Sequence, residues 1–268
     1  FRAGMQYQES LSNRDVGTCI LSISDLHIPF QKPIETFSEY AGKIDILQVN
    51  GDCVDAAALS RFSRVYRQSP MDEILLARQY LIDLIEMLQP KKVVVNYGFQ
   101  NYLAKNIDED LLALMPKTAL ELILVDGFNH YNKELHTKVH YDPLIEVFSA
   151  ESIEIIYNDS WYSQIGSTVL CHPMAFSSGI LKTSEKALRY FQDIGLDFDS
   201  LVMSHVHRVG SYSVGKYNLY EQGCCCDTSK MEYADGKLTT PQREGFIVVY
   251  QDKDGKLIES KTHIVRLN

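Results

Sequence analysis

Short apolar runs alternate with amphipathic stretches through the first third of the chain. The runs at 16–24 (VGTCILSIS), 44–49 (IDILQV) and 92–96 (KVVVN) are apolar and rich in β-branched residues, which is typical of strands buried on both faces. Residues 71–89 keep their polar side chains on one stripe and stop at Pro90, so they predict a helix. Strands that alternate with helices favour a parallel sheet with right-handed crossovers.

The pattern becomes more irregular between residues 102 and 158, where we expect an inserted, mostly helical segment that could cap a site. His136 and His140 lie four residues apart in it, as on one helical face, but lack the Glu of a metalloprotease helix and are expected to be surface residues. Helices are predicted at 108–115 and 142–148, and a strand at 153–157.

The last third of the chain is rich in predicted strands. Turn residues such as Gly166 and Gly215 separate short runs, which is the pattern of β-hairpins. No repeat or linker interrupts the chain, so the sequence predicts one α/β domain over residues 1–268, with a mostly antiparallel sheet in its second half. Hairpins are predicted at 161–171, 209–222 and 246–265, with a helix at 184–193 and a strand at 200–204.

Composition and charge narrow the range of functions. The chain has 268 residues and a formal net charge of −9, so its overall field repels nucleic acid and anionic lipid. No apolar run approaches the roughly 20 residues that cross a bilayer, and residues 1–15 lack the plan of a signal peptide. We therefore expect a cytoplasmic protein with no membrane partner.

The six cysteines fit a reducing compartment, because none forms a C-x-x-C pair and a chain of this length needs no disulfides. Cys19 and Cys171 fall in strand-like runs, where a thiol behaves as a small hydrophobic group. The run Cys224-Cys225-Cys226 has the donors for a soft metal, but successive side chains on a strand point to alternate faces. A structural role is therefore favoured for this run.

Carboxylate and imidazole side chains return at the ends of the predicted strands. Singly, each is weak evidence, since an Asp or a His near a turn is usually a surface group or a cap. Together they are the donors of a metal centre, because carboxylates and neutral imidazoles suit Mn, Fe, Ni or Zn. In chain order they are Asp25, His27, Asp52, Asp55, His172, His205 and His207.

In this order the residues resemble the calcineurin-like metallophosphoesterase family. The family pattern is D-x-H, G-D-x-x-D, G-N-H-(D/E), a lone His after a strand, and G-H-x-H, and this chain keeps the ligands of four of these five motifs over residues 16–207. The resemblance implies an αββα four-layer sandwich of mixed sheets flanked by helices. It also implies hydrolysis of a phosphodiester or nucleotide-like substrate by a metal-bridging hydroxide, with Asp52 among the catalytic residues.

The resemblance further implies two divalent ions, for which Mn is expected first and Fe, Ni or Zn are alternatives. Asp52 would bridge the two ions, and such a pair can activate water and clamp phosphoryl oxygens. The implied first set of ligands is Asp25, His27, Asp52 and His207, and the second is Asp52, His172, His205 and an Asn of the third motif.

The third motif departs from the family pattern. Gly98-Phe99-Gln100-Asn101 stands in place of G-N-H-(D/E), and Phe99 cannot bind a metal. Gln100 takes the catalytic position of a His, but a carboxamide cannot deliver a proton near neutral pH. Gln100 or Asn101 is a candidate replacement ligand, so we expect the second ion to bind more weakly and to be only partly occupied. Asn101 and Arg208 are the candidate substrate contacts.

Two hypotheses follow from these observations. The first is a phosphoesterase of attenuated activity, which acts on a phosphorylated small molecule or a short single-stranded nucleic acid. The second is a non-catalytic descendant of the fold, which binds a metal or a phosphorylated ligand and acts through a partner. The six retained ligands favour metal binding under both, and the altered third motif favours the second.

Restoring the family residues in the third motif tests this interpretation of the loop. In the double variant Phe99→Asn, Gln100→His we expect turnover of simple phosphate esters to rise, because losing an acid–base partner typically costs roughly 10²- to 10⁴-fold. The measurement is steady-state hydrolysis by the two proteins under the same metal load. An unchanged turnover counts against the interpretation.

Overall fold

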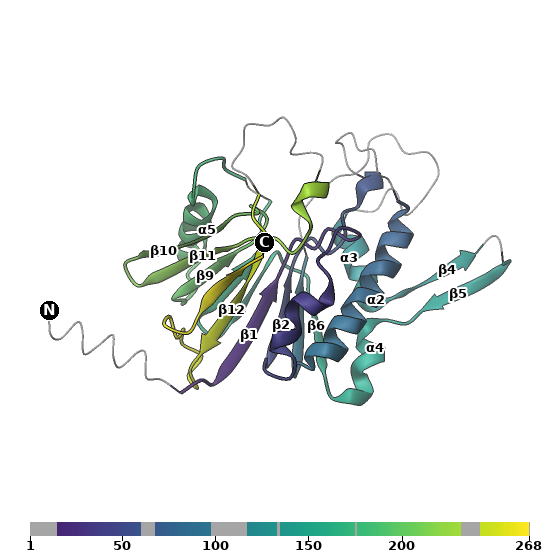
Figure 1. Ribbon diagram of the computed structural model, residues 1–268, viewed down its shortest axis with the longest axis horizontal. Coiled ribbons are helices and arrows are strands. Elements are labelled where there is room, and N and C mark those ends of the chain that lie inside the picture. Colours follow the sequence, from purple (N-terminus) through teal and green to yellow (C-terminus); the bar gives the residue numbers. More distant parts are fainter. Residues whose placement is uncertain are drawn as a thin grey trace, which may run out of the picture.

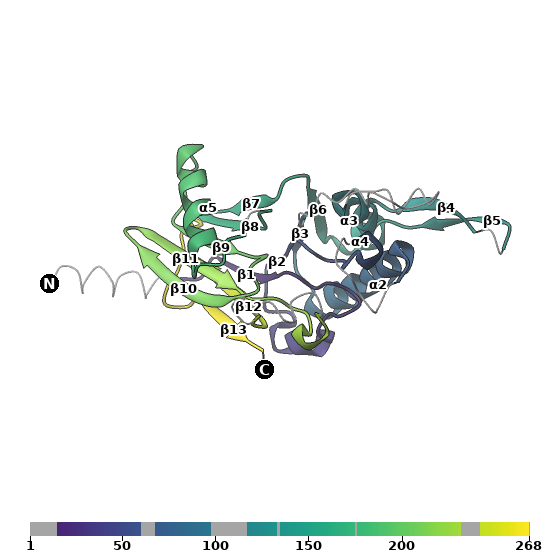
Figure 2. The ribbon, with the colours of Figure 1, turned by 90° about the horizontal axis from the view of Figure 1, so that it is seen from above.

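The computed structural model describes residues 15–59, 68–97, 117–132, 135–174, 176–231 and 242–267. Within these residues two β-sheets pack face to face, and helices cover both of their outer sides (Figures 1 and 2). The predicted αββα sandwich of mixed sheets is thereby confirmed.

The first sheet has six strands and supplies the parallel centre of the fold. Across the sheet the order is β13 (His263–Arg266), β12 (Gly245–Gln251), β1 (Thr18–Ile23), β2 (Ile46–Asn50), β3 (Lys92–Asn96) and β6 (Glu154–Asn158). The strands β1, β2 and β3 run parallel, as predicted, and β6 extends this parallel set; β12 and β13 add to the other edge in antiparallel pairs.

The second sheet has five strands and is mixed rather than mostly antiparallel. Across it the order is β10 (Val209–Val214), β11 (Tyr217–Gln222), β9 (Ser200–Met203), β8 (Thr168–Cys171) and β7 (Tyr162–Ile165). The strand β9 pairs in parallel with both β8 and β11, and the edge pairs are antiparallel. The prediction missed the parallel pairs because the helix α5 (Lys182–Asp193) serves as a crossover that returns the chain in the same direction.

Helices lie on the outer side of each sheet. The helix α5 covers the second sheet, while α2 (Pro70–Leu88), α3 (Lys117–Asp126), α4 (Leu144–Phe148) and the 3₁₀ helix η1 (Ile34–Tyr40) lie on the side of the first (Figures 1 and 2). The hydroxyl of Ser69 caps α2 by accepting from Met71 N at 3.2 Å, and Gln89 ends it in the left-handed conformation. Further 3₁₀ turns are η2 (Ala57–Leu59), η4 (Ser149–Glu151) and η5 (Thr228–Lys230).

Three clusters of buried apolar side chains fill the spaces between the four layers. One lies between the first sheet and its helices, one between the two sheets, and one between the second sheet and α5. Representative residues of the three clusters are, respectively, Leu21 and Leu84, Ile20 and Leu170, and Val169 and Phe191.

The segment expected to be irregular and helical contains a β-hairpin instead. Its strands are β4 (Phe128–Asn132) and β5 (Thr137–Tyr141), which project from the body of the molecule (Figure 1). His136 and His140 belong to this hairpin rather than to a helix, and both side chains are exposed as expected. The sequence does not predict the hairpin, because β5 is mostly exposed and lacks the alternation of apolar and polar residues that marks a half-buried strand.

The other parts of the predicted insertion are placed only in part. The predicted strand at 153–157 is β6, which completes the parallel part of the first sheet, and α4 matches the predicted helix at 142–148. The predicted helix at 108–115 lies outside the described residues, as does the third motif at 98–101. The single domain and the cap over the site stay predictions.

The second strand of the hairpin predicted at 246–265 is shorter than expected. The structure has β13 only from His263, because Leu257 and Ile258 are buried against the rest of the fold and Thr262 N donates back to Ile258 O at 3.0 Å.

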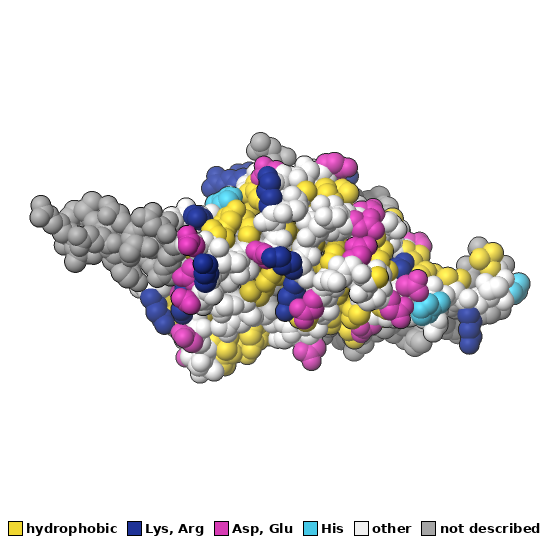
Figure 3. Space-filling view, turned by 90° about the horizontal axis from the view of Figure 1, so that it is seen from below, with side chains coloured by type: hydrophobic (Ala, Val, Ile, Leu, Met, Phe, Trp, Pro, Cys, Tyr) yellow, Lys and Arg dark blue, Asp and Glu magenta, His cyan; other side chains and the backbone are white. Residues whose placement is uncertain are grey.

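Acidic and basic side chains are interspersed with apolar ones on the face shown in Figure 3. No helix among the described residues is long and apolar enough to cross a membrane.

A ladder of asparagines, of which Asn50 and Asn96 are fully buried and Asn158 is half-buried, joins the two sheets where their strands end. Asn50, Asn96 and Asn158 are register partners on β2, β3 and β6, and each amide donates to the next side chain, at 2.9 Å from Asn96 to Asn50 and 3.1 Å from Asn158 to Asn96. The Asn50 amide also donates to Ser204 Oγ at 2.7 Å, directly after β9 of the second sheet. The ladder therefore fixes how the strand ends of one sheet lie over those of the other.

Removing the middle of this ladder is expected to lower stability. Asn96→Ala leaves the Asn50 and Leu170 oxygens short of a donor, and a buried polar group without its partner costs about 1–3 kcal/mol. Denaturant unfolding gives the free energy of unfolding of each protein. The matched variant is Asn129→Ala in the exposed hairpin, which should change it by less than about 0.5 kcal/mol; equal effects of the two substitutions would contradict a structural role for the ladder.

Candidate metal centre

The predicted ligands come together at one edge of the sandwich, where strands of both sheets end. Asp25 and His27 follow β1, and Asp52 follows β2, so the carboxylates come from the first sheet. The second sheet supplies imidazoles, His172 after β8 and a pair after β9. The pair is His205 and His207.

Strained backbone marks the same residues. A non-glycine residue with positive φ is uncommon, and such residues cluster at functional sites, where the surrounding structure holds them. Of the six predicted ligands, five have this conformation. They are Asp25 (52°), His27 (44°), Asp52 (52°), His205 (72°) and His207 (48°).

The first group of donors is Asp25, His27 and His207, whose ligand atoms all lie within 4.8 Å of one another. His207 Nε2 lies 3.0 Å from Asp25 Oδ1 and 3.3 Å from His27 Nε2. The Nδ1 atoms of both imidazoles face oxygens, at 3.2 Å from Asp55 Oδ1 for His27 and 3.0 Å from Gln242 Oε1 for His207. With a proton on each Nδ1, two nitrogen lone pairs face each other across 3.3 Å, an arrangement that a cation between them stabilises.

The second group is Asp52, His172 and His205, with the same limit of 4.8 Å between ligand atoms. His172 Nδ1 donates to Asn50 O at 2.8 Å, so the neutral ring carries its lone pair on Nε2. That Nε2 is fully buried, has no hydrogen-bond partner and lies 3.5 Å from Asp52 Oδ2. A nitrogen lone pair directed at a buried carboxylate is repelled by it. A cation bound between the two would remove this repulsion.

Asp52 lies between the two groups. Its Oδ2 is 3.8 Å from His27 Nε2 in the first group and 3.5 Å from His172 Nε2 in the second. The Asp52 side chain is almost fully buried. A carboxylate in this position has the geometry to bridge two cations, and the donor set of carboxylates and imidazoles fits divalent transition metals.

The charges of the centre are poorly balanced without a cation. Burial opposes ionisation of Asp25, but His172 and His207 hold the pKa of its carboxyl well below the usual range. Burial also opposes protonation of His172, yet the carboxylates of Asp52 and Asp25 raise the pKa of this imidazole to about 9. Desolvation and the neighbouring His172 lower the pKa of His205 to about 4. The carboxylates thus attract positive charge into the centre, and a metal can take the place of that proton.

Two buried glutamates hold the loop that carries Asp52, and neither is predicted from the sequence. Glu73 on α2 accepts from Ala56 N and, at 3.2 Å, from Ala57 N; Glu121 on α3 accepts from Cys53 N at 3.0 Å. Glu73 is a charged residue on the buried side of an otherwise apolar helix stripe, which was the available signal. These bonds stabilise the positive φ of Ala56 and of the Asp52 backbone beside it.

Arg208 is buried and bonded to the loop that follows β8. Its guanidinium donates to Gly179 O at 2.9 Å, Ser178 O at 3.1 Å and Ser177 O at 3.3 Å, and lies 5.5 Å from the ring centroid of Phe176. In this structure Arg208 therefore shapes the loop beside His205, and its predicted contact with substrate stays a prediction. Gln100 and Asn101 lie outside the described residues.

No protein-family model and no curated protein matches the chain in sequence. Among solved structures it is similar to wild-type Vps29 of Entamoeba histolytica in complex with zinc, at 13% identity over 93% of this chain and 98% of that one, with a TM-score of 0.41. An archaeal phosphodiesterase has 16% identity over 93% and 99% of the two chains, with a TM-score of 0.41. A metallophosphoesterase of Sphaerobacter thermophilus has 14% identity over 93% and 88%, with a TM-score of 0.42.

At these identities and TM-scores the similarities carry no conclusion about activity, substrate or metal, which rest on the residues of the centre itself.

Glu73 offers a test of how the centre is held. Glu73→Ala leaves the Ala56 and Ala57 amides without their acceptor, so we expect the metal affinity to fall by roughly 10- to 100-fold, as is typical for residues that support metal ligands. Calorimetric titration with Mn²⁺ measures the affinity. Glu86→Ala, on the exposed side of the same helix, is the control, and an affinity loss shared by both variants would rule out a specific role for Glu73.

Proposed function

We propose that the protein is a metal-dependent phosphoesterase that hydrolyses a phosphodiester or nucleotide-like substrate. The observation that carries the proposal is the orientation of three imidazoles. His27, His172 and His207 each direct Nδ1 to an oxygen outside the centre and Nε2 toward buried carboxylates. Oriented imidazoles around shared carboxylates are the donors of a metal centre rather than of an ordinary buried hydrogen-bond network.

The proposed ligand sets follow the two groups. Asp25, His27 and His207 would hold one divalent ion, His172 and His205 the other, and Asp52 would contact both. Two ions about 3.5–4 Å apart lower the pKa of bound water and clamp the phosphoryl oxygens of an in-line displacement. Mn is proposed first because the carboxylates of Asp25 and Asp52 are oxygen donors, which suit it, and Fe, Ni or Zn are alternatives because four imidazoles complete the set.

The proposed route for substrate passes His205. Among the predicted ligands His205 is the partly exposed one, and the exposed ring of Phe176 lies 6.5 Å from it between centroids. Met174, also exposed, belongs to the same loop. An apolar, aromatic rim beside a metal centre suits a planar leaving group such as a nucleobase or an aryl ring.

The proposed chemistry requires a leaving group that can depart without being protonated. Gln100 would stand where a His would assist departure, and a carboxamide can donate a hydrogen bond but not a proton. We therefore propose that the enzyme favours esters whose leaving group departs as a stable anion, as an aryl oxide does. The attenuated activity would then appear as slow hydrolysis of esters whose leaving group needs a proton.

A non-catalytic role is the second candidate, and the altered third motif favours it. With Phe99 in place of an Asn ligand, the second ion would have fewer donors. Such a protein would bind a single metal or a phosphorylated ligand and act through a partner. It shares the metal-binding residues with the first candidate, and the measurement that separates the two is turnover.

The two candidates are separated by Mn²⁺-dependent hydrolysis of an aryl phosphodiester and the matching monoester. We expect the diester to be cleaved, and Asp52→Asn to lower kcat/KM by more than about 100-fold, beyond what a supporting residue typically costs. Asp193→Asn, an exposed carboxylate at the end of α5, is the matched control and should leave the rate unchanged.

The metal content of each protein, measured in parallel, keeps the outcomes distinct. A preference for diester over monoester would support the proposed substrate class. No hydrolysis above the Asp52→Asn background, with metal bound to the wild type, would overturn the enzyme proposal and leave the binding role.

A further inference from the structure

The cysteine run lies beside the metal centre, on the segment that follows β11. Gly223 begins it with a φ of 86°, in a place where a Cβ would meet Gly245 N at 2.9 Å. The next three residues alternate in direction: Cys225 packs in the core of the first sheet, while Cys224 and Cys226 pack together on the other side. The alternation expected from a strand is therefore observed, and it brings two thiols to one side rather than separating them.

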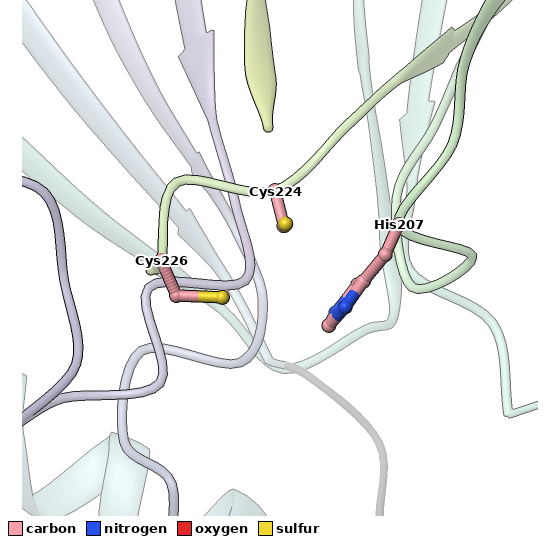
Figure 4. A group of neighbouring side chains, drawn as sticks. All are labelled: His207, Cys224 and Cys226. Atoms are coloured by element: carbon pink, nitrogen blue, oxygen red, sulfur yellow. The ribbon is translucent and has the colours of Figure 1, made fainter. Parts of the chain in front are cut away.

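The two thiols point toward His207 (Figure 4). The sulfur atoms of Cys224 and Cys226 and a ring nitrogen of His207 all lie within 4.8 Å of one another, and all three residues are buried. In tetrahedral zinc sites, bonds of about 2.3 Å to sulfur and 2.0–2.1 Å to nitrogen put the donors about 3.5–3.8 Å apart. Small side-chain rotations would bring these donors to that spacing.

The backbone holds the three residues in fixed positions. Cys224 N donates to Arg243 O at 3.1 Å, and Arg243 N donates to His207 O at 2.8 Å, so one short segment ties the two sides of the group together. Cys225 N donates to Ser24 O at 2.9 Å, next to Asp25. Donors fixed in this way lose little freedom when an ion binds, which favours binding.

We propose that Cys224, Cys226 and His207 form a binding site for a thiophilic divalent ion, Zn²⁺ in the first place, beside the centre of carboxylates and imidazoles. A neutral imidazole has one nitrogen lone pair, so His207 serves either this ion or the ion held with Asp25 and His27, and not both at once. Thiolate ligands select zinc and other soft ions over Mn²⁺, whose preferred donors are oxygens. Three protein donors leave the fourth position of tetrahedral zinc to water or to a carbonyl oxygen. Arg243 O, which accepts from the Cys224 thiol at 3.4 Å, is one such oxygen.

The alternative is that the two thiols act only as small hydrophobic groups. They pack with Met231, and the partly buried ring of Phe30 packs against this cluster. A purely apolar role would not require a buried imidazole beside the two sulfur atoms. The experiment has to distinguish a thiolate–metal bond from such packing.

Cobalt is the probe, because a thiolate bound to Co²⁺ gives a charge-transfer absorption band that oxygen and nitrogen donors do not give. The full chain, kept reduced with a phosphine and freed of metal, is titrated with Co²⁺ to saturation. We expect the band in the wild type and in Cys225→Ser, whose thiol packs away from His207, and its loss in Cys224→Ser, Cys226→Ser together. No band in the saturated wild type, or a band that persists in the double variant, overturns the proposal.

A second measurement needs no variant and covers the case in which the double variant fails to fold. X-ray absorption of the wild type saturated with zinc should show sulfur neighbours at about 2.3 Å. Nitrogen and oxygen neighbours alone would overturn the proposal. Both readouts are independent of hydrolysis, so their failure and the failure of the proposed phosphoesterase activity are distinguishable.

Discussion

The candidate metal centre depends on the hydrogen bonds through which Asn50 joins the two sheets. Its amide donates to Ser204 Oγ, and its carbonyl oxygen accepts from His172 Nδ1. Since the carboxylates come from the first sheet and three of the imidazoles from the second, a slip between the sheets would separate the two halves of the donor set. An unmade bond in the interior costs about 1–3 kcal/mol, so a buried amide bonded to both sheets resists that slip.

The same centre also depends on strain that distant residues offset. Positive φ at a non-glycine residue costs of order 1–3 kcal/mol, and Asp25, Asp52 and His205 all carry it. The bond from His205 N to Asp25 Oδ2, at 3.1 Å, joins two of these strained turns directly. Glu73 and Glu121 hold the turn after Asp52 from the helix layer. The helices beneath the first sheet thus contribute to the geometry of a site that none of them enters.

The sequence allows the ligands to be predicted because parallel strands end at one edge, so Asp25 and Asp52 could be brought together from strand order alone. The hydrogen bonds that hold these ligands in place could not be predicted in this way. The contacts of Asn50 with Ser204 and of Glu73 with Ala56 span 154 and 17 residues and follow from how layers pack, which no local pattern records. The hairpin at Phe128–Tyr141 was missed for the opposite reason, since a projecting ribbon buries too little to leave a periodic pattern.

His207 stands between two kinds of donor, and this position bears on metal choice. Its Nε2 lies among the oxygens and nitrogens of Asp25 and His27, while the thiols of Cys224 and Cys226 approach the same ring. Sites made of oxygen and nitrogen bind zinc more tightly than manganese, so affinity alone would give zinc both positions. Under the proposal made above, the thiol pair offers zinc a better set of donors at His207. Zinc then competes less with manganese or iron for the position defined by the carboxylates. The choice of metal at each position would follow from the difference in softness between the neighbouring donors.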